Sequence, residues 1–174
     1  MFMYQIDENE NIRERFRPSK IKVLFIGESA PASGDFFYKE DSLCGYTQQS
    51  FAKIFPEAAK MTCGEFLKFF MNKGCFLDDL CHIPVNKLSK TEKMNHCKQA
   101  VPLLASRIKG YQPDVIIIML LKIVEYVKDA IIISKLPDID YWSVPYGGYG
   151  NQNRYIEELS LILDQLVKDG IISL

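Results

Sequence analysis

A carboxylate and a group of aromatics share one loop, and these residue types could handle a water and a flat ring. The loop, residues 27–38, follows a short apolar run, carries Glu28 near its start, and contains proline and glycine. A carboxylate can orient a water as a general base, and aromatic rings can stack on a planar heterocycle. The alternative is that Glu28 caps backbone N–H groups while Phe36, Phe37 and Tyr38 belong to the core.

This loop does not have the pattern of a phosphate-binding loop. It has neither the glycine spacing of a dinucleotide fingerprint nor the Gly-Lys-Ser/Thr ending of a P-loop. Ser29 or Ser33 could act as the nucleophile of an unrelated α/β hydrolase, but the sequence has no Gly-x-Ser-x-Gly elbow and poor histidine candidates. We therefore rank a serine hydrolase last.

A second loop, residues 144–153, is rich in glycine and tyrosine. One interpretation is a turn that ends at a helix cap. The other is a flexible loop whose Tyr146 and Tyr149, with Arg154, insert into a minor groove of DNA.

Four short apolar runs predict the strands that position these loops. They are residues 22–26, 75–81, 115–119 and 141–144, and the third has the β-branched composition of a central parallel strand. Helical stretches alternate with them, which predicts a parallel sheet covered on both faces. Ligands of such sheets bind beyond the carboxyl ends of the strands, which selects the loops at residues 27–38, 78–86 and 145–153.

Local signals set the ends of several helices. Thr62 with Glu65, and Ser89 with Glu92, have capping-box spacing. We read residues 48–60 as a broken helix, and Pro102 is expected to kink or split the helix that contains it. Residues 121–136 and a final amphipathic segment are also predicted to be helical.

Length and composition favour one domain. A chain of 174 residues is close to the roughly 150 expected per domain, so we assign residues 21–174 to a single domain and residues 1–20 to an arm or short helix. The formal net charge of -1 means that any DNA-binding surface must be local.

No targeting or membrane signal is evident in the sequence. The longest apolar run, residues 115–121, is too short to cross a bilayer, and the first residues lack the apolar core of a signal peptide. The five cysteines form no C-x-x-C pair and are odd in number, so reduced thiols and a cytoplasmic location are expected.

The strand followed by Gly-Glu-Ser-x-Pro, with Gly34 and then Phe-Tyr at positions 37 and 38, resembles the first motif of the uracil-DNA glycosylase superfamily. Residues 76–80, Pro84 and residues 112–118 are similar in order and spacing to its later framework. The resemblance covers roughly residues 20–168 and implies a three-layer α/β/α sandwich around a four-stranded parallel sheet.

The resemblance also implies roles for residues of this chain. The substrate would be a damaged or deaminated base flipped out of DNA, bound by a monomer that needs no cofactor or metal. Glu28 and Ser29 fall on the water-activating loop. The implied base-binding residues are Gly27, Pro31, Phe37, Tyr38 and Asp79. Asp79 would suit a base edge that presents donors, because an ionised carboxylate donates no hydrogen bond.

The resemblance fails at the loop after the fourth strand. The superfamily commonly has a histidine there that stabilises the departing base, but His82 and His96 lie elsewhere in this chain. That role would fall to Asn151, its neighbours Gln152 and Asn153, or backbone N–H groups at a helix start. The implied DNA-contact residues are Tyr146, Gly147, Gly148, Tyr149 and Arg154.

Some superfamily members hold an iron–sulfur cluster with four cysteines. Cys81 and Cys97 have the separation of one ligand pair, but the N-terminal pair is missing. The neighbouring His82 and His96 match no standard zinc spacing, so core thiols and surface imidazoles are expected.

Scattered lysines could form a rim that tracks DNA phosphates, although such lysines are usually solvated surface. The candidates are Lys20, Lys22, Lys53, Lys60, Lys87, Lys90 and Lys93.

The leading hypothesis is a uracil-DNA-glycosylase-like protein that hydrolyses the N-glycosidic bond of a flipped base. The alternative is a non-catalytic binder of a nucleobase, a nucleotide or damaged DNA, which the missing histidine favours.

Overall fold

The computed structural model describes residues 2–136 and 138–174, with residues 2–7 as backbone only. Met1, which belongs to the predicted N-terminal arm, and Pro137 lie outside the described residues. Within this part of the chain, no helix combines the length and the hydropathy needed to span a bilayer.

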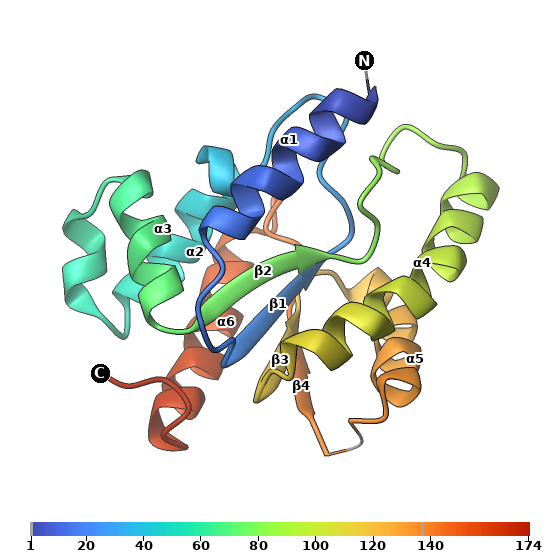
Figure 1. Ribbon diagram of the computed structural model, residues 1–174. Helices are drawn as coiled ribbons and strands as arrows, with labels where there is room; N and C mark the ends of the chain where they lie inside the picture. Colours follow the sequence, from blue (N-terminus) through green and yellow to red (C-terminus); the bar gives the residue numbers. More distant parts are fainter. Residues whose placement is uncertain (1, 137) are drawn as a thin grey trace.

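Four parallel strands form one sheet in the order β2-β1-β3-β4 (Figure 1). Val23 of β1 lies opposite Cys75 on one side and Val115 on the other, so both neighbours start level with it. The strands are β1 (Val23–Gly27), β2 (Cys75–Asp79), β3 (Val115–Ile118) and β4 (Asp140–Ser143). The predicted α/β fold with a four-stranded parallel sheet is confirmed.

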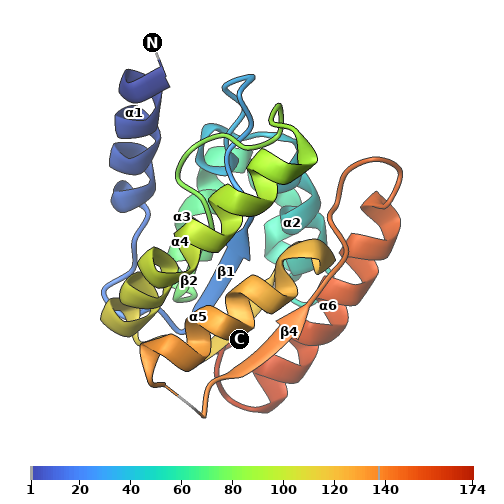
Figure 2. The same cartoon turned by 90° about the vertical axis from the view of Figure 1, so that its right-hand side faces the viewer.

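Helices cover both faces of the sheet, which gives three layers (Figures 1 and 2). The pair α4 and α5 lies on one face, and α2, α3 and α6 lie on the other. The helices are α1 (Phe2–Arg15), α2 (Ser42–Ala52), α3 (Cys63–Asn72), α4 (Lys90–Tyr111), α5 (Val124–Ser134) and α6 (Gln152–Lys168), with short 3-10 turns η1 (Phe37–Lys39), η2 (Pro56–Lys60) and η3 (Leu121–Ile123).

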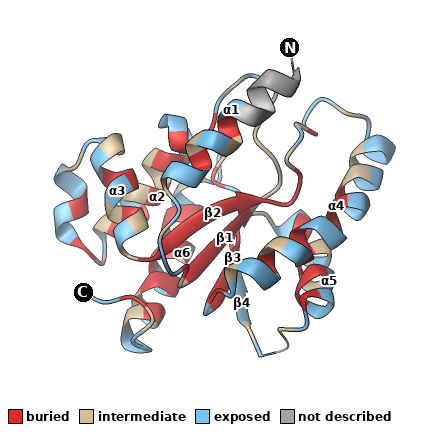
Figure 3. Ribbon diagram, viewed as in Figure 1, coloured by how far each residue is buried: buried red, intermediate tan, exposed pale blue. Residues whose placement is uncertain are grey.

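The core follows the strands (Figure 3). Every residue of β2 and β3 is buried, and so are the first four of β1, because apolar runs in a parallel sheet meet helices on both sides. β4 differs: it is an edge strand with all four residues exposed, including Tyr141 and Trp142.

Two predicted capping boxes form and start two helices. The hydroxyls of Thr62 and Ser89 accept from the backbone N–H groups of Glu65 and Glu92, and both glutamates bond back to the cap. These caps satisfy N–H groups that the first turn leaves free.

Pro102 does not split its helix, which runs without interruption from Lys90 to Tyr111. Pro102 faces solvent, where water can satisfy the carbonyl that its missing N–H leaves free. The predicted break at residues 48–60 is present as the boundary between α2 and η2.

The N-terminal segment is mainly helical and docks on the rest of the fold beside the carboxyl end of β2 (Figure 1). Arg13 anchors α1 there, because its side chain is buried against residues of β2.

Candidate functional site

The loops after β1 and β2 are tied together at the carboxyl edge of the sheet. Ser29 Oγ accepts from the N–H of Val85 at 3.2 Å, and the side chain of Asn86 accepts from the N–H of Ala32 at 3.0 Å. The Ser29 hydroxyl thus holds the neighbouring loop in place, and among the described residues it is not paired with a base that would activate it as a nucleophile.

Glu28 extends from this loop into an ion pair. Its Oε2 lies 2.7 Å from Nζ of Lys93, which stands in the first turn of α4. The Glu28 side chain is 15% exposed and that of Lys93 is 34% exposed, so solvent reaches the pair. Among the described contacts, Glu28 accepts no backbone N–H with its carboxylate. The alternative that Glu28 serves as a cap is therefore wrong.

Phe37 and Tyr38 are core residues. Both are buried, and the Tyr38 hydroxyl donates to the carbonyl of Leu77 while accepting from its N–H. Burial raises the pKa of Tyr38 well above its usual value. One face of Tyr38 is covered by the parallel ring of Phe16 at 5.3 Å between centroids. Neither ring is open to a base, which corrects their assignment as stacking aromatics: Phe16, which follows α1, covers Tyr38, and Phe37 packs against Phe70.

Asp79 is buried and bound to Arg13. Arg13 Nη2 donates to Oδ2 of Asp79 at 2.6 Å, and Nη1 donates to Oδ1 of Asp78 at 2.5 Å. Burial raises the pKa of Asp79 to about 6, with the charge of Asp78 adding to the shift and that of Arg13 opposing it. Asp79 also lies against Gly27, where a Cβ would overlap Oδ1. The structure therefore brings Gly27 and Asp79, two predicted base-binding residues, together. However, the Asp79 carboxylate accepts its hydrogen bond from Arg13, in the place where the donor of a base would lie.

Asp78 is the centre of a larger polar cluster. Arg107 Nε donates to its Oδ2 at 2.7 Å, the Tyr111 hydroxyl donates to the same atom at 3.2 Å, and His82 Nε2 lies 2.8 Å from Oδ1. Burial acts to raise the pKa of Asp78, but the hydrogen bond to His82 and the charges of Arg13 and Arg107 outweigh it and hold that pKa well below the usual range.

Sequence reasoning missed the basic members of this cluster. Arg13 lies 65 positions before Asp78, in a segment with no assigned role, and no local spacing links them. Arg107 and Tyr111 do share a helix face at i and i+4, which was an available signal.

An open pocket of about 260 Å³ lies between α2 and the loop after β4. Its lining includes three tyrosines, Tyr46, Tyr146 and Tyr149, together with Ser42, Leu43, Gly147, Gly148 and Gln152. Tyr149 is 98% exposed and its ring lies 6.2 Å from that of Tyr146. Burial raises the pKa of Tyr146, and the charge of Asp41 adds to the shift.

The backbone of this loop is strained at its most exposed aromatic. Tyr149 has φ of 55°, a left-handed conformation that non-glycine residues rarely adopt, and Gly150 follows with φ of 86°. Such strain persists where the surroundings enforce it, often at binding sites. Asn151 precedes α6 without capping it, so its amide is not engaged by the helix, and Arg154 pairs with Glu158 at 2.6 Å.

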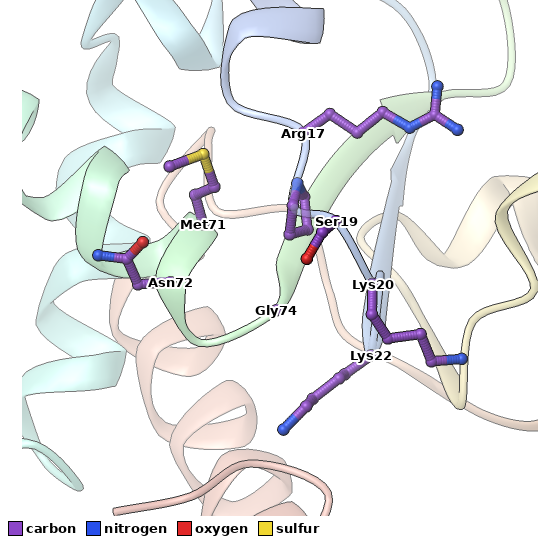
Figure 4. Close-up of a pocket in the computed structure, with 8 residues that line it drawn as sticks. Arg17, Ser19, Lys20, Lys22, Met71, Asn72 and Gly74 are labelled. Carbon is purple, nitrogen blue, oxygen red and sulfur yellow. The ribbon is translucent and has the colours of Figure 1, made fainter.

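A second pocket, of about 340 Å³, lies at the opposite, amino-terminal edge of the sheet (Figure 4). Arg17, Lys20 and Lys22 line it, but their charged ends point in different directions and so do not converge on one anion. Lys20 is paired with Asp114 at 2.9 Å.

The predicted lysines do not form one continuous rim. Two of them precede β1, namely Lys20 and Lys22, and three follow β2, namely Lys87, Lys90 and Lys93. In a parallel sheet these positions lie at opposite edges.

The cysteines are free thiols, and Sγ of Cys81 lies 3.9 Å from Sγ of Cys97. Across residues 2–136 and 138–174, no group of three or more His, Cys, Asp and Glu side chains is arranged to hold a metal ion.

No family model matches this chain, and no curated protein shows a significant match to it.

Proposed function

We propose that this chain is a uracil-DNA-glycosylase-like protein that binds a damaged or deaminated base extruded from DNA and hydrolyses its N-glycosidic bond. One observation carries the proposal. Glu28 follows the interior strand β1 at the carboxyl edge of the sheet, the same edge at which the loop after β4 forms the tyrosine-lined pocket. In open α/β sheets this edge is where ligands bind.

The tyrosine-lined pocket suits a flat heterocycle. We assign base stacking to the rings of Tyr146 and Tyr46, because Phe37 and Tyr38 are packed in the core. Stacking of a base on one aromatic ring contributes about 1–3 kcal/mol. The exposed Tyr149 and the neighbouring Arg154 would contact the DNA around the extruded nucleotide.

Glu28 then acts on the sugar. Its carboxylate accepts a proton from a water that attacks C1′, and its negative charge stabilises the positive charge that develops on the sugar as the bond to the base breaks. The departing base takes the electron pair of that bond. The free amide of Asn151 and backbone N–H groups at the start of α6 are the donors available to it, in place of a histidine.

We further propose that the protein acts as a monomer and needs no cofactor. Its five free thiols are typical of a reducing compartment, so we propose that it is cytoplasmic.

The experiment is a base-release assay. Purified protein is incubated with oligonucleotides that carry uracil, hypoxanthine or a mismatch, and abasic product is measured. Product from one of them is expected, and the absence of product from all of them contradicts hydrolysis.

A non-catalytic binder is the second candidate. The ion pair between Glu28 and Lys93 favours it, because a carboxylate held by an amine is less free to bind water. Tight calorimetric binding of a base, nucleotide or damaged DNA without turnover would identify this function.

A further inference from the structure

The nearest partner of the Glu28 carboxylate is a primary amine. Lys93 Nζ lies 2.7 Å from Oε2 of Glu28, which is the distance at which a hydrogen-bonded water would sit. The amine and a hydrolytic water therefore compete for the same carboxylate oxygen.

Lys93 is also free to move toward a substrate. Its side chain is 34% exposed, it comes from the first turn of α4, and Glu28 is its one partner among the described ion pairs. A lysine carries its amine on a flexible four-carbon stem, so a few torsional changes take Nζ from the carboxylate to an adjacent carbon.

We propose that Lys93 is the nucleophile of an abasic-site lyase activity, forming an imine with C1′ of the aldehydic sugar that base removal leaves. The proposal rests on the proposed function, since it gives the site at Glu28 a second substrate, abasic DNA.

Lys93 and Glu28 together supply the nucleophile and every proton transfer that imine formation needs. A proton passes from the Lys93 ammonium to the Glu28 carboxylate, and the free amine attacks the aldehyde carbon C1′ to give a carbinolamine. Glu28 returns the proton to the departing hydroxyl, which leaves as water, and a protonated imine remains.

Strand cleavage follows from the imine. The Glu28 carboxylate removes a proton from C2′, a carbon–carbon double bond forms between C2′ and C3′, and the bond from C3′ to the phosphate oxygen breaks with its electron pair on the phosphate. Water then hydrolyses the imine and restores the lysine.

The test is reductive trapping on a preformed abasic site. Protein is mixed with a duplex oligonucleotide that carries one aldehydic abasic site in the presence of sodium cyanoborohydride, and the covalent protein–DNA adduct is measured on a denaturing gel. Lys93→Arg keeps a cation opposite Glu28 but cannot form an imine, and its thermal unfolding checks that it folds. Lys98→Ala, at an exposed position five residues later on the same helix, is the matched control.

We expect an adduct with the wild type and with Lys98→Ala, and its loss with a folded Lys93→Arg. No adduct with the wild type, or an undiminished adduct with Lys93→Arg, overturns the proposal. Base release measured in parallel separates the two hypotheses: release without trapping leaves hydrolysis standing and removes the lyase, whereas Lys93-dependent trapping without release supports the lyase and contradicts hydrolysis.

Discussion

Arg13 and Asp79, 66 positions apart in the sequence, form a buried ion pair in which Nη2 donates to Oδ2 at 2.6 Å. This contact joins the N-terminal helix to the carboxyl end of β2. Because Asp79 in turn lies against Gly27, the pair also defines the space beside the loop that carries Glu28. The helix is thus part of the site's framework.

Replacement of Arg13 by methionine should destabilise the fold strongly. The change removes the positive charge that pairs with the buried carboxylates of Asp78 and Asp79. Removing one partner of such a buried pair costs about 3–5 kcal/mol. Urea denaturation measures the loss of unfolding free energy. Arg154→Ala removes an exposed pair with Glu158 and should cost only about 0.3–0.5 kcal/mol. Equal effects of the two changes would refute the structural role of Arg13.

Asp79 should make stability depend on pH in an unusual direction. Its pKa in the folded protein is about 6, above the value of 3.8 for a free aspartate, so its stabilising contribution is present below pH 3.8 and is lost as the pH rises through 6. The unfolding free energy of the wild type, relative to Asp79→Asn, should fall by on the order of 3 kcal/mol from about pH 4 to about pH 7. Chemical denaturation across this range measures it, and a difference that rises with pH contradicts the raised pKa of Asp79.

Gly27 and Gly45 should respond oppositely to alanine. A Cβ at Gly27 meets the Asp79 carboxylate, which the pair with Arg13 holds in place, so Gly27→Ala should cost about 1–3 kcal/mol. Gly45 lies in α2 with open space around it, and Gly45→Ala should add about 0.5–1 kcal/mol. Thermal unfolding of both variants is the check. A neutral Gly27→Ala would mean that Asp79 is free to move.

Tyr149 should contribute to DNA binding. Its ring is almost fully exposed in a strained loop beside the pocket, where it can stack on a base. Tyr149→Ala should weaken binding to DNA by about 1–3 kcal/mol, as measured by fluorescence anisotropy. Tyr141→Ala, on the exposed strand β4, is the control and should have little effect. A larger loss of affinity with Tyr141→Ala would mean that DNA binds along the edge strand β4 and not at the loop that carries Tyr149.

The strands and helix starts were accessible from the sequence because their signals are local. The apolar run at residues 115–119 gave the strongest strand signal in the chain, and it forms β3 (Val115–Ile118). Thr62 and Ser89 carry cap signals within three residues of their partners. Such features depend on residues that are close in the sequence, so they can be predicted without knowledge of the tertiary contacts.

The site was less accessible because it depends on contacts between distant residues. The sequence suggested both a core and a stacking role for Tyr38, and the packing of Phe16 against it decided for the core. The partner of Glu28, Lys93, lies 65 positions later, and nothing in the spacing pairs them. The loop at residues 78–86 was selected from the sequence, and Asp79 ends β2 at its start, but the ion pair of Asp79 with Arg13 was not predicted.

The role of Glu28 as general base is tested by single-turnover base release with wild type, Glu28→Gln and Glu57→Gln. Glutamine keeps the size of Glu28 and its contact with Lys93 but cannot take a proton, so the rate on the preferred oligonucleotide should fall by about 10²–10⁴-fold. Glu57 is exposed on η2, and Glu57→Gln should retain the wild-type rate. An undiminished rate with Glu28→Gln would contradict general-base catalysis by Glu28, and no base released by the wild type from any substrate would contradict hydrolysis.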